Sequence, residues 1–268
     1  MSASQNKLSI SPDGESFPLP EQADYAAEYE RVKALAEAAR AKGQEVVVVM
    51  GVGFVGAVMA AIVADCTDRD GRPSKFVIGC QRPSTRSFWK IPLLNRGVSP
   101  VKAEDPQVDV LIGRCVNDRK TLTATYNSQV IDLADCVVID VQCDFLKQEL
   151  GNMKSGECDM AALEATLKTV GQHIRPECLV LIETTVAPGT TEFVAWPILK
   201  KAFANRGITS VPLLAHSYER VMPGREYVAS IRDFWRVCAG CDAAARARVE
   251  KFLHEVLNTD QFPLTVMD

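Results

Sequence analysis

The sequence has no apolar run near the ~20 residues that a membrane-spanning helix requires. Its polar first residues, MSASQNKLSISPDGES, hold no apolar segment of the kind found in secretory leaders. Neither sign of charge dominates, because the formal net charge is −4 over 268 residues. No basic surface for nucleic acid or for an anionic membrane is therefore expected. These absences predict a cytoplasmic protein with neither kind of partner.

Histidine is scarce, and the three histidines show no metal-ligand spacing relative to the cysteines. The nine cysteines are an odd number in a chain too large to need disulfides, so most are expected to be small buried hydrophobic residues. Cys238 and Cys241 form a C-x-x-C pattern just before a predicted helix, which leaves a redox role open. Chance occurrence is the favoured interpretation, and no metal site is predicted.

Apolar residues make up 47% and charged residues 24% of the chain, which is typical of a globular protein. Residues 1–19 are polar and are predicted to be disordered. An amphipathic helix is predicted from Glu21 to Lys42, with Gly43 as its stop. Its apolar positions are Tyr25, Tyr29, Val32, Leu35 and Ala39. We therefore divide the chain into an N-terminal extension, residues 1–44, and a folded domain, residues 45–268.

Beyond residue 44, strand-like and helix-like segments alternate. Strands are predicted at 45–50, 75–79, 136–142, 178–184, 211–215 and 234–239. Helices are predicted at 54–65, 87–96, 157–174, 189–205 and 242–257, and the third carries the apolar stripe Leu163, Leu167, Val170 and Ile174. The strands are continuous apolar runs, as in CVVIDV, which suits a parallel sheet covered on both faces. The pattern predicts a doubly wound, Rossmann-like α/β fold with a helical N-terminal extension.

Three glycines follow the first strand directly. Gly51, Gly53 and Gly56 give G-x-G-x-x-G between a strand and a helix, which is the context this motif requires. Gly51 would allow a tight turn, Gly53 a close approach of a pyrophosphate, and Gly56 close packing of helix on strand. The helix N-terminus would then present free N–H groups to the phosphates. The predicted cofactor-binding residues here are Gly51, Val52, Gly53, Phe54, Val55 and Gly56.

The residue after the second strand should contact the adenosine ribose, and NAD-specific domains carry an acid there that binds the ribose hydroxyl groups. This chain has Cys80, Gln81 and Arg82 instead, and all three are candidate cofactor contacts. Arg82 and Arg86 could accept a 2′-phosphate, which would favour NADP. The residues by themselves leave NAD and NADP both open.

Two more strand ends carry reactive side chains. ETTVAPGTT, residues 183–191, places Thr185 at a strand end, where ligands bind in open α/β sheets. YERVMPGR, residues 218–225, places Glu219 and Arg220 after the next strand. A carboxylate there could position a water or act as a base, and an arginine could pair with phosphate.

The ordered set GVGFVG, NRGVSP, ADCVVIDVQ, ETTVAPGTT and YERVMPGR resembles the UDP-glucose/GDP-mannose dehydrogenase family of nucleotide-sugar dehydrogenases. The resemblance covers residues 45–268, which would be the family's N-terminal dinucleotide-binding domain. The E-R-V-x-P-G form is most similar to the branch that oxidises UDP-N-acetylhexosamines such as UDP-N-acetylmannosamine. It implies NAD as cofactor, a nucleotide sugar as substrate and two successive oxidations at C6 to a uronic acid.

The resemblance also implies roles for single residues. Thr185 matches the threonine near nicotinamide and the catalytic water, and Glu219 matches the glutamate that positions or activates that water. Val141, Gln142 and Cys143 match a strand-end segment that borders the cofactor, where the family usually carries Thr-Pro. Cys80 at the ribose acid and Tyr218 in place of a proline are further departures.

The family's nucleophilic cysteine lies in a later domain, outside this sequence, so we expect these 268 residues alone to be inactive. Family members are implied to be homodimers through regions outside this sequence, so this chain could be a monomer. Two alternatives remain: a non-catalytic dinucleotide-binding module, and a fragment of a β-hydroxyacid-type NAD(P) dehydrogenase. The coding sequence that follows Asp268 would separate the first alternative from a dehydrogenase.

Overall fold

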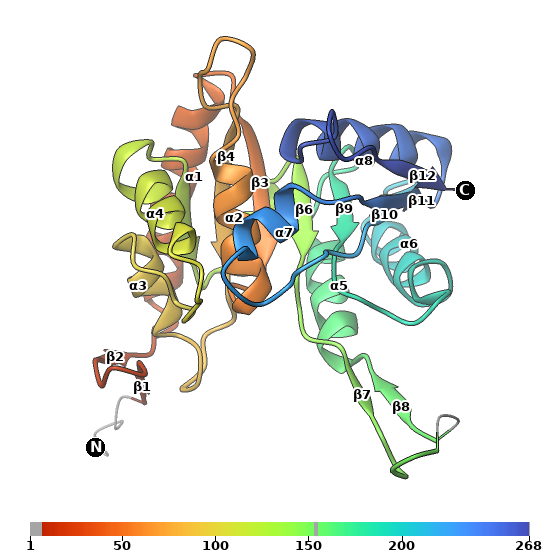
Figure 1. Ribbon diagram of the computed structural model, residues 1–268, viewed down its shortest axis with the longest axis horizontal. Coiled ribbons are helices and arrows are strands. Elements are labelled where there is room, and N and C mark those ends of the chain that lie inside the picture. Colours follow the sequence, from red (N-terminus) through yellow and green to blue (C-terminus); the bar gives the residue numbers. More distant parts are fainter. Residues whose placement is uncertain (1–6, 153–154, 268) are drawn as a thin grey trace.

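An eight-stranded sheet forms the centre of the molecule, whose computed structural model describes residues 7–152 and 155–267 (Figure 1). The spatial order is β12-β11-β10-β9-β6-β3-β4-β5, and every neighbouring pair is parallel except β10 with β11. The strands are β3 (Glu45–Met50), β4 (Lys75–Cys80), β5 (Leu122–Thr125), β6 (Cys136–Ile139), β9 (Leu179–Ile182), β10 (Leu213–His216), β11 (Val237–Gly240) and β12 (Thr265–Met267). The predicted α/β fold with a mostly parallel sheet is confirmed.

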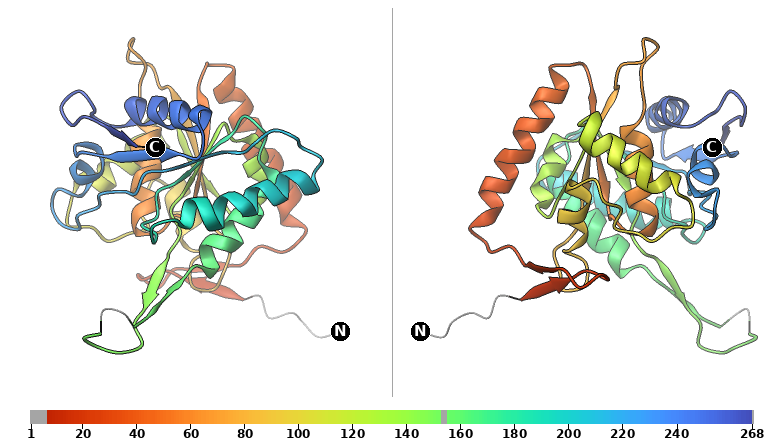
Figure 2. Two further views of the ribbon diagram at one scale, coloured as in Figure 1. Left: turned by 90° about the vertical axis from the view of Figure 1, so that its right-hand side faces the viewer. Right: turned by 60° about the vertical axis from the view of Figure 1, so that its left-hand side comes forward.

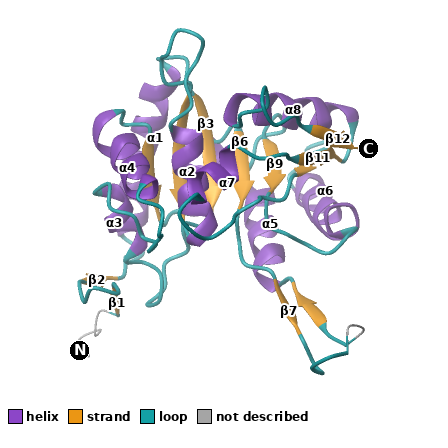
Figure 3. Ribbon diagram, viewed as in Figure 1, coloured by secondary structure: helices purple, strands orange, loops and turns teal. Residues whose placement is uncertain are grey.

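Helices cover both faces of this sheet (Figure 3). One face packs against α1 (Asp24–Arg40), the 3-10 helix η2 (Ser128–Leu133), α5 (Ala161–His173) and α6 (Trp196–Asn205). The other packs against α2 (Phe54–Ala64), α3 (Lys90–Asn95), α4 (Gln107–Gly113), α7 (Tyr227–Arg232) and α8 (Ala243–Val256). Single π turns, η1 (Arg114–Asp118) and η3 (Thr191–Ala195), extend α4 and precede α6. Alternate residues of β3 enter opposite cores, which explains its unbroken run of valines.

The apolar stripe predicted for the third helix is correct, since all four of its residues are fully buried. Its start is not, because Glu157–Asp159 form a strand, β8, and α5 begins only at Ala161. Helix α1 lies within its predicted range, and Gly43 follows it with a φ of +80°. Leu35, however, is 40% exposed, and Ala36 takes its place in the core.

The prediction of disorder at the N-terminus is wrong for the part of it that the structure describes, whereas residues 1–6 lie outside that part. Strands β1 (Leu8–Ile10) and β2 (Ser16–Pro18) form an antiparallel hairpin. The hairpin is attached to the body because Ser9 is buried and its hydroxyl accepts a hydrogen bond from the Trp89 amide at 3.1 Å. Glu15 adds an ion pair with Arg96. These distant partners make up for the low apolar content of the segment.

A second hairpin, β7 (Asp144–Leu146) with β8 (Glu157–Asp159), extends away from the body (Figures 1 and 2). Neither strand was predicted, and the same holds for β5, β12 and the short helices α4 and α7. Each of these elements is at most seven residues long. Segments this short contain too few repeats of the helical or strand-like apolar pattern to be recognised from the sequence.

The chain leaves β3 in two directions across the sheet. It first runs through β4 and β5 on one side, and then crosses to β6, β9 and β10 on the other. Ligands of open α/β sheets bind at the carboxyl ends of the strands where the order reverses. That point lies between β3 and β6, and it is occupied by the glycine loop, residues 51–53, and by Asp140.

Candidate functional site

Two of the three motif glycines are required by close backbone contacts. Gly51 has a φ of +98°, and a Cβ there would lie 2.5 Å from the Asp140 carbonyl oxygen. A Cβ at Gly56 would lie 1.9 Å from the Gly51 carbonyl oxygen. Gly53 differs, because a Cβ there would have nothing within 4 Å. The space above Gly53 is open, as the approach of a phosphate group requires.

The N-terminus of α2 points its backbone donors toward this open space. Gly53 is the N-cap in an extended conformation, and no side chain caps the helix. The first N–H groups of an α-helix have no intrahelical acceptor and carry the positive end of the helix dipole. An anion is the fitting partner for such an end. The residues present therefore fit a pyrophosphate.

Gln81 holds the glycine loop in place. Its Oε1 accepts a hydrogen bond from the Val52 amide at 3.1 Å, and the Cys80 carbonyl accepts one from the Gly51 amide at 2.9 Å. Gln81 thus occupies the position at the end of β4 that faces the crevice. Arg82 and Arg86 are exposed beyond it.

The side chain of Cys80, a predicted cofactor contact, lies in the protein core. It is 3% exposed and packs with Met50 and Ile78, because alternate residues of β4 face opposite sides of the sheet. Burial raises the pKa of the Cys80 thiol to about 12. Only its backbone contributes to the crevice, through the bond to Gly51.

The segment after β6, which begins with Asp140 and Val141, adjoins the glycine loop. Cγ1 of Val141 would lie 3.7 Å from a Cβ at Gly51. Thr184 fixes this segment, since its hydroxyl donates to the Val141 carbonyl at 2.8 Å and accepts from the Val141 amide at 3.1 Å. Gln142 is exposed, and Cys143 leads away into the β7–β8 hairpin.

Thr185 and Glu219 come from neighbouring strand ends. Thr185 is exposed directly after β9, whereas Glu219 is half-buried after β10. The two segments meet at Glu183, whose carbonyl accepts a hydrogen bond from the Glu219 amide at 3.1 Å. The Glu219 carboxylate accepts one from the Val221 amide at 2.5 Å. Both candidate catalytic residues thus lie at the carboxyl edge of the sheet that carries the glycine loop.

An ionic cluster at this edge combines the buried Glu183 and Arg236 with the partly exposed Asp140 and Glu219. Arg236 is 1% exposed, and its Nη2 lies 2.9 Å from Oε1 of the fully buried Glu183. Its Nη1 donates to the Tyr218 carbonyl at 2.8 Å, just before Glu219. Arg236 therefore joins the end of β9 to the segment that carries Glu219.

Acids outnumber cations in this cluster, and their protonation responds to burial. Burial raises the pKa of Glu183 to about 7; Arg236 opposes this shift and Glu219 adds to it. Burial, and then the charge of Glu183, raises the pKa of Asp140 well above its ordinary range. Both Asp140 carboxylate oxygens and Oε2 of Glu183 are buried without a hydrogen-bond partner among the described residues. Unpaired buried carboxylates favour the protonated form.

Phe54, the first residue of α2, packs against Tyr227, the first residue of α7. Their rings stack with centroids 4.8 Å apart and an interplanar angle of 21°, and the Tyr227 hydroxyl donates to the Phe54 carbonyl. Phe54 is 41% exposed, while Tyr227 is fully buried. The contact holds the first turn of α2, whose uncapped amides include those of Phe54 and Val55.

Residues 45–257 match a family model described as the UDP-glucose/GDP-mannose dehydrogenase family, NAD binding domain. The chain belongs to this family. Its members are NAD-dependent nucleotide-sugar dehydrogenases. The match therefore favours this family over the alternative of a β-hydroxyacid-type dehydrogenase.

Known proteins agree with this assignment. UDP-N-acetyl-D-mannosamine dehydrogenase of Pyrococcus horikoshii is 33% identical over 93 residues, which are 35% of this chain and 22% of that protein. Its counterpart in Methanococcus maripaludis is 26% identical over 125 residues, 47% of this chain and 25% of that protein.

Solved structures extend the similarity to most of the chain. An NDP-N-acetyl-D-galactosaminuronic acid dehydrogenase of Methanosarcina mazei has a TM-score of 0.71 and 32% identity, covering 87% of this chain and 46% of that one. GDP-mannose dehydrogenase of Pseudomonas aeruginosa has a TM-score of 0.64 at 20% identity, covering 82% and 45%, and shows the shared fold. The chain thus spans about half the length of these relatives. No helix in the described residues is both long and apolar enough to cross a membrane.

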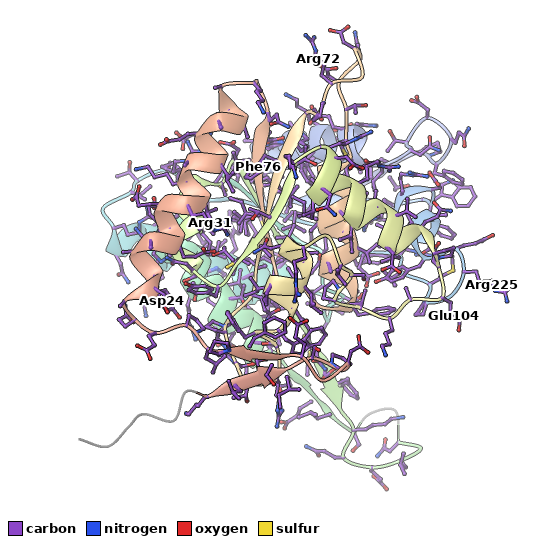
Figure 4. All side chains as sticks on the ribbon, turned by 90° about the vertical axis from the view of Figure 1, so that its left-hand side faces the viewer. Asp24, Arg31, Arg72, Phe76, Glu104 and Arg225 are labelled. Atoms are coloured by element: carbon purple, nitrogen blue, oxygen red, sulfur yellow. The ribbon has the colours of Figure 1, made fainter. Side chains whose placement is uncertain are left out.

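Two cavities lie away from the glycine loop of this NAD-binding domain. One of about 410 Å³ lies between α1 and the strands β4 and β5, and Arg31 and Phe76 are among its lining residues (Figure 4). The other, of about 330 Å³, lies beside the end of β10 and is lined by Thr191, Trp196 and His216. Each of these three carries a buried polar atom that has no partner in the described structure.

The C-x-x-C pattern carries no activated thiol. Cys238 is buried in β11 and Cys241 is half-buried beyond it, and burial raises the pKa of each to about 11. Within residues 7–152 and 155–267, no three metal-ligating side chains gather at one place. The expectation of a small buried residue therefore holds for Cys238, whereas Cys241 is only partly buried.

Asp140 and Arg236 are the residues of the site that sequence reasoning missed. Asp140 ends the run VVID, so a polar residue at the end of a buried strand was a usable signal. Arg236 follows an aromatic pair before β11, and nothing local marks it as buried. Its partner lies 53 residues earlier in the chain.

Proposed function

We propose that this chain binds NAD across the switch point between β3 and β6, with the pyrophosphate at the N-terminus of α2. The observation that carries the proposal is the contrast among the three glycines. Gly51 and Gly56 are fixed by packing, whereas Gly53 faces open space in front of uncapped helix donors. A ligand that needs both space and N–H donors explains this arrangement.

The residues around the loop take roles from this placement. Val52 and Val55 flank the phosphate position, Gln81 holds the loop for the adenosine ribose, and Val141 lies beneath the nucleotide. Because Gln81 is neutral, it repels a 2′-phosphate less than an acid would, and Arg82 is near enough in sequence to pair with one. We therefore propose NAD as the main cofactor, with NADP as a weaker ligand.

For an enzyme of the relatives' full length, the proposed reaction is oxidation of a UDP-N-acetylhexosamine at C6, because the archaeal relatives are named for UDP-N-acetyl-D-mannosamine. The bound NAD would accept a hydride in each of two oxidations. Thr185, exposed at the end of β9, would hold the water near the reacting carbon. In such an enzyme the nucleophilic cysteine would hold the oxidised sugar as a thioester. Glu219 would take a proton from the water that hydrolyses this thioester. The family resemblance implies a nucleophilic cysteine outside residues 1–268, so we propose that alone they bind cofactor without completing the reaction.

Calorimetric titration of the chain with NAD⁺ and with NADP⁺ tests the cofactor proposal. Gly53→Ala is the decisive variant, because its methyl group meets no protein atom but enters the phosphate position. We expect a loss of NAD⁺ affinity of roughly tenfold or more with an unchanged melting temperature. Gly113→Ala in α4 is the matched control, since its Cβ would meet only a contact of 3.7 Å. Equal affinities for all three proteins would contradict the proposal.

Assay of the protein with nucleotide sugars, in whatever length its coding sequence specifies, tests the reaction. UDP-N-acetylmannosamine should yield two equivalents of NADH per sugar, and Glu219→Gln should slow the hydrolysis that follows the second oxidation, so that uronic acid is released more slowly than NADH is first formed. A protein that binds NAD⁺ but oxidises no nucleotide sugar would favour the non-catalytic alternative.

A further inference from the structure

Two of the nine cysteines meet at the base of the β7–β8 hairpin. The Sγ atoms of Cys143 and Cys158 lie 3.3 Å apart, although 15 positions separate them in the chain. Both residues are half-buried, so small reagents have access to them. An S–S bond is ~2.05 Å long, so the two sulfurs need approach by only ~1.3 Å to be joined.

The hairpin is weakly held without such a bond. Its ladder pairs only Asp144–Leu146 with Glu157–Asp159, and an isolated two-stranded ribbon is marginal in water. Asp144 faces Asp159 directly across the ladder, and like charges in that position repel. Phe145 and Leu146 are more than half exposed, so the strands gain little from burial. The hairpin also projects from the body, with its base as its attachment (Figure 2).

We propose that Cys143 and Cys158 form a reversible dithiol–disulfide couple that low-molecular-weight disulfides such as oxidised glutathione convert to an intramolecular disulfide. One cysteine thiolate attacks oxidised glutathione, which forms a mixed disulfide and releases one glutathione thiolate. The second cysteine thiolate then attacks the mixed disulfide and releases the other. In sum, two protein thiols become one disulfide, one glutathione disulfide becomes two glutathione thiols, and the two protons pass to the released thiolates.

The position of the pair links its redox state to the crevice. Cys143 follows Val141 and Gln142, and Val141 adjoins the glycine loop. Cys158 lies in β8, three residues before α5 begins. The disulfide therefore ties the segment after β6 to the lead into α5 and closes the hairpin at its base. This inference depends only on the two thiols and holds whichever cofactor the chain binds.

The reaction should be slow near neutral pH and faster in alkali. Burial, the hydrogen bond to Cys158 and the charges of Asp144 and Asp159 raise the pKa of Cys143 to about 11. Only the thiolate attacks, so the rate rises with pH up to that value. The redox state should accordingly be measured after exchange has reached equilibrium.

The test equilibrates the whole chain in glutathione buffers of rising oxidised fraction, followed by acid quenching, alkylation and peptide mapping. We expect a peptide that links Cys143 to Cys158 and seven alkylated cysteines, which is the nine of the sequence less two. Cys143→Ser should leave Cys158 carrying one glutathione instead. Cys238→Ser, which alters the C-x-x-C pattern, should form the same disulfide as the wild type.

Trypsin cleavage at Lys147, inside the hairpin, supplies a second measurement. Oxidation should slow this cleavage severalfold in the wild type and in Cys238→Ser, and leave it unchanged in Cys143→Ser. The proposal is overturned if all nine thiols stay free across the buffer range, if mapping joins other cysteines, or if cleavage is equally fast in both redox states. Circular dichroism of each variant identifies any that has failed to fold.

Discussion

Arg236 and Glu183 form an ion pair that is shielded almost completely from solvent, with Nη2 and Oε1 2.9 Å apart and exposures of 1% and 0%. The pair lies directly beneath the strand ends that carry Thr185 and Glu219. Arg236 also holds the carbonyl of Tyr218, so one guanidinium connects two parts of the proposed active site. No other cation of the described chain ion-pairs with Glu183.

Replacing Arg236 with methionine should destabilise the protein strongly. The change leaves Glu183 and Asp140 buried without a cation, and breaking one side of a buried pair costs about 3–5 kcal/mol. Urea unfolding at pH 8 measures the loss. The control is Arg232→Met, which removes a partly exposed pair with Asp233 and should cost less than about 1 kcal/mol. Equal losses for the two variants would show that the buried pair is no stronger than a surface pair.

The contribution of Glu183 to the free energy of unfolding should fall as the pH rises from about 4.5 to about 7. The pKa of Glu183 is raised from 4.5 to about 7 in the folded state, so the folded protein binds its proton more tightly than the unfolded chain does. The stabilisation is complete below pH 4.5 and is lost as the pH passes 7, by roughly 3 kcal/mol in all.

Glu183→Gln isolates this contribution. Partial burial lowers the pKa values of His173 and His216, which act in the opposite direction below pH 6.5, so the quantity to compare is the wild type minus the variant at each pH. The difference should change with pH only between about 4.5 and 7. A difference that is flat across this range would mean that Glu183 titrates normally.

Gly56→Ala should lower stability even without a cofactor. The new Cβ would lie 1.9 Å from the Gly51 carbonyl oxygen, which is backbone and cannot rotate away. Overpacking of this kind costs about 1–3 kcal/mol. Thermal and urea unfolding measure the change, with Gly113→Ala as the helical control that should be neutral. Gly53→Ala should resemble the control, so a loss at both motif positions would argue against their different roles.

Gln81→Ala should weaken NAD⁺ binding by about two- to tenfold, because the Val52 amide loses the acceptor that fixes the glycine loop. Arg82→Ala, one residue further and exposed, should leave NAD⁺ binding unchanged but reduce any affinity for NADP⁺. Titration of both variants with both cofactors gives the four values needed. If Arg82→Ala weakens NAD⁺ more than Gln81→Ala does, the assignment of these two positions is reversed.

Several features of the site could be predicted from the sequence because they are local. The glycine spacing relative to β3 and α2 sets the loop, and the stripe from Leu163 to Ile174 sets the buried face of α5. In each case the determining residues lie within a few turns or strand positions of one another. Their periodicity is therefore visible without knowledge of the fold.

Other features depended on register. Cys80 and Gln81 are neighbours in sequence, yet one faces the core and the other the crevice, because strand side chains alternate. The exact end of β4 decides which is which, and strand ends are poorly marked in the sequence. The N-terminal hairpin was missed for a related reason, since the buried Ser9 accepts its hydrogen bond from Trp89, 80 positions away.

By itself, the sequence determined the strand–loop–helix unit at residues 45–64, the parallel sheet and the family. Only the tertiary structure decided that Asp140, Glu183 and Arg236 meet, and that Cys143 touches Cys158. The physical reason is the strand order, which brings β6 beside β3 and β9 beside β6, across stretches of chain that no local pattern spans. Local propensities shape each element, whereas the burial of charge and the pairing of thiols follow from where the sheet places the element ends.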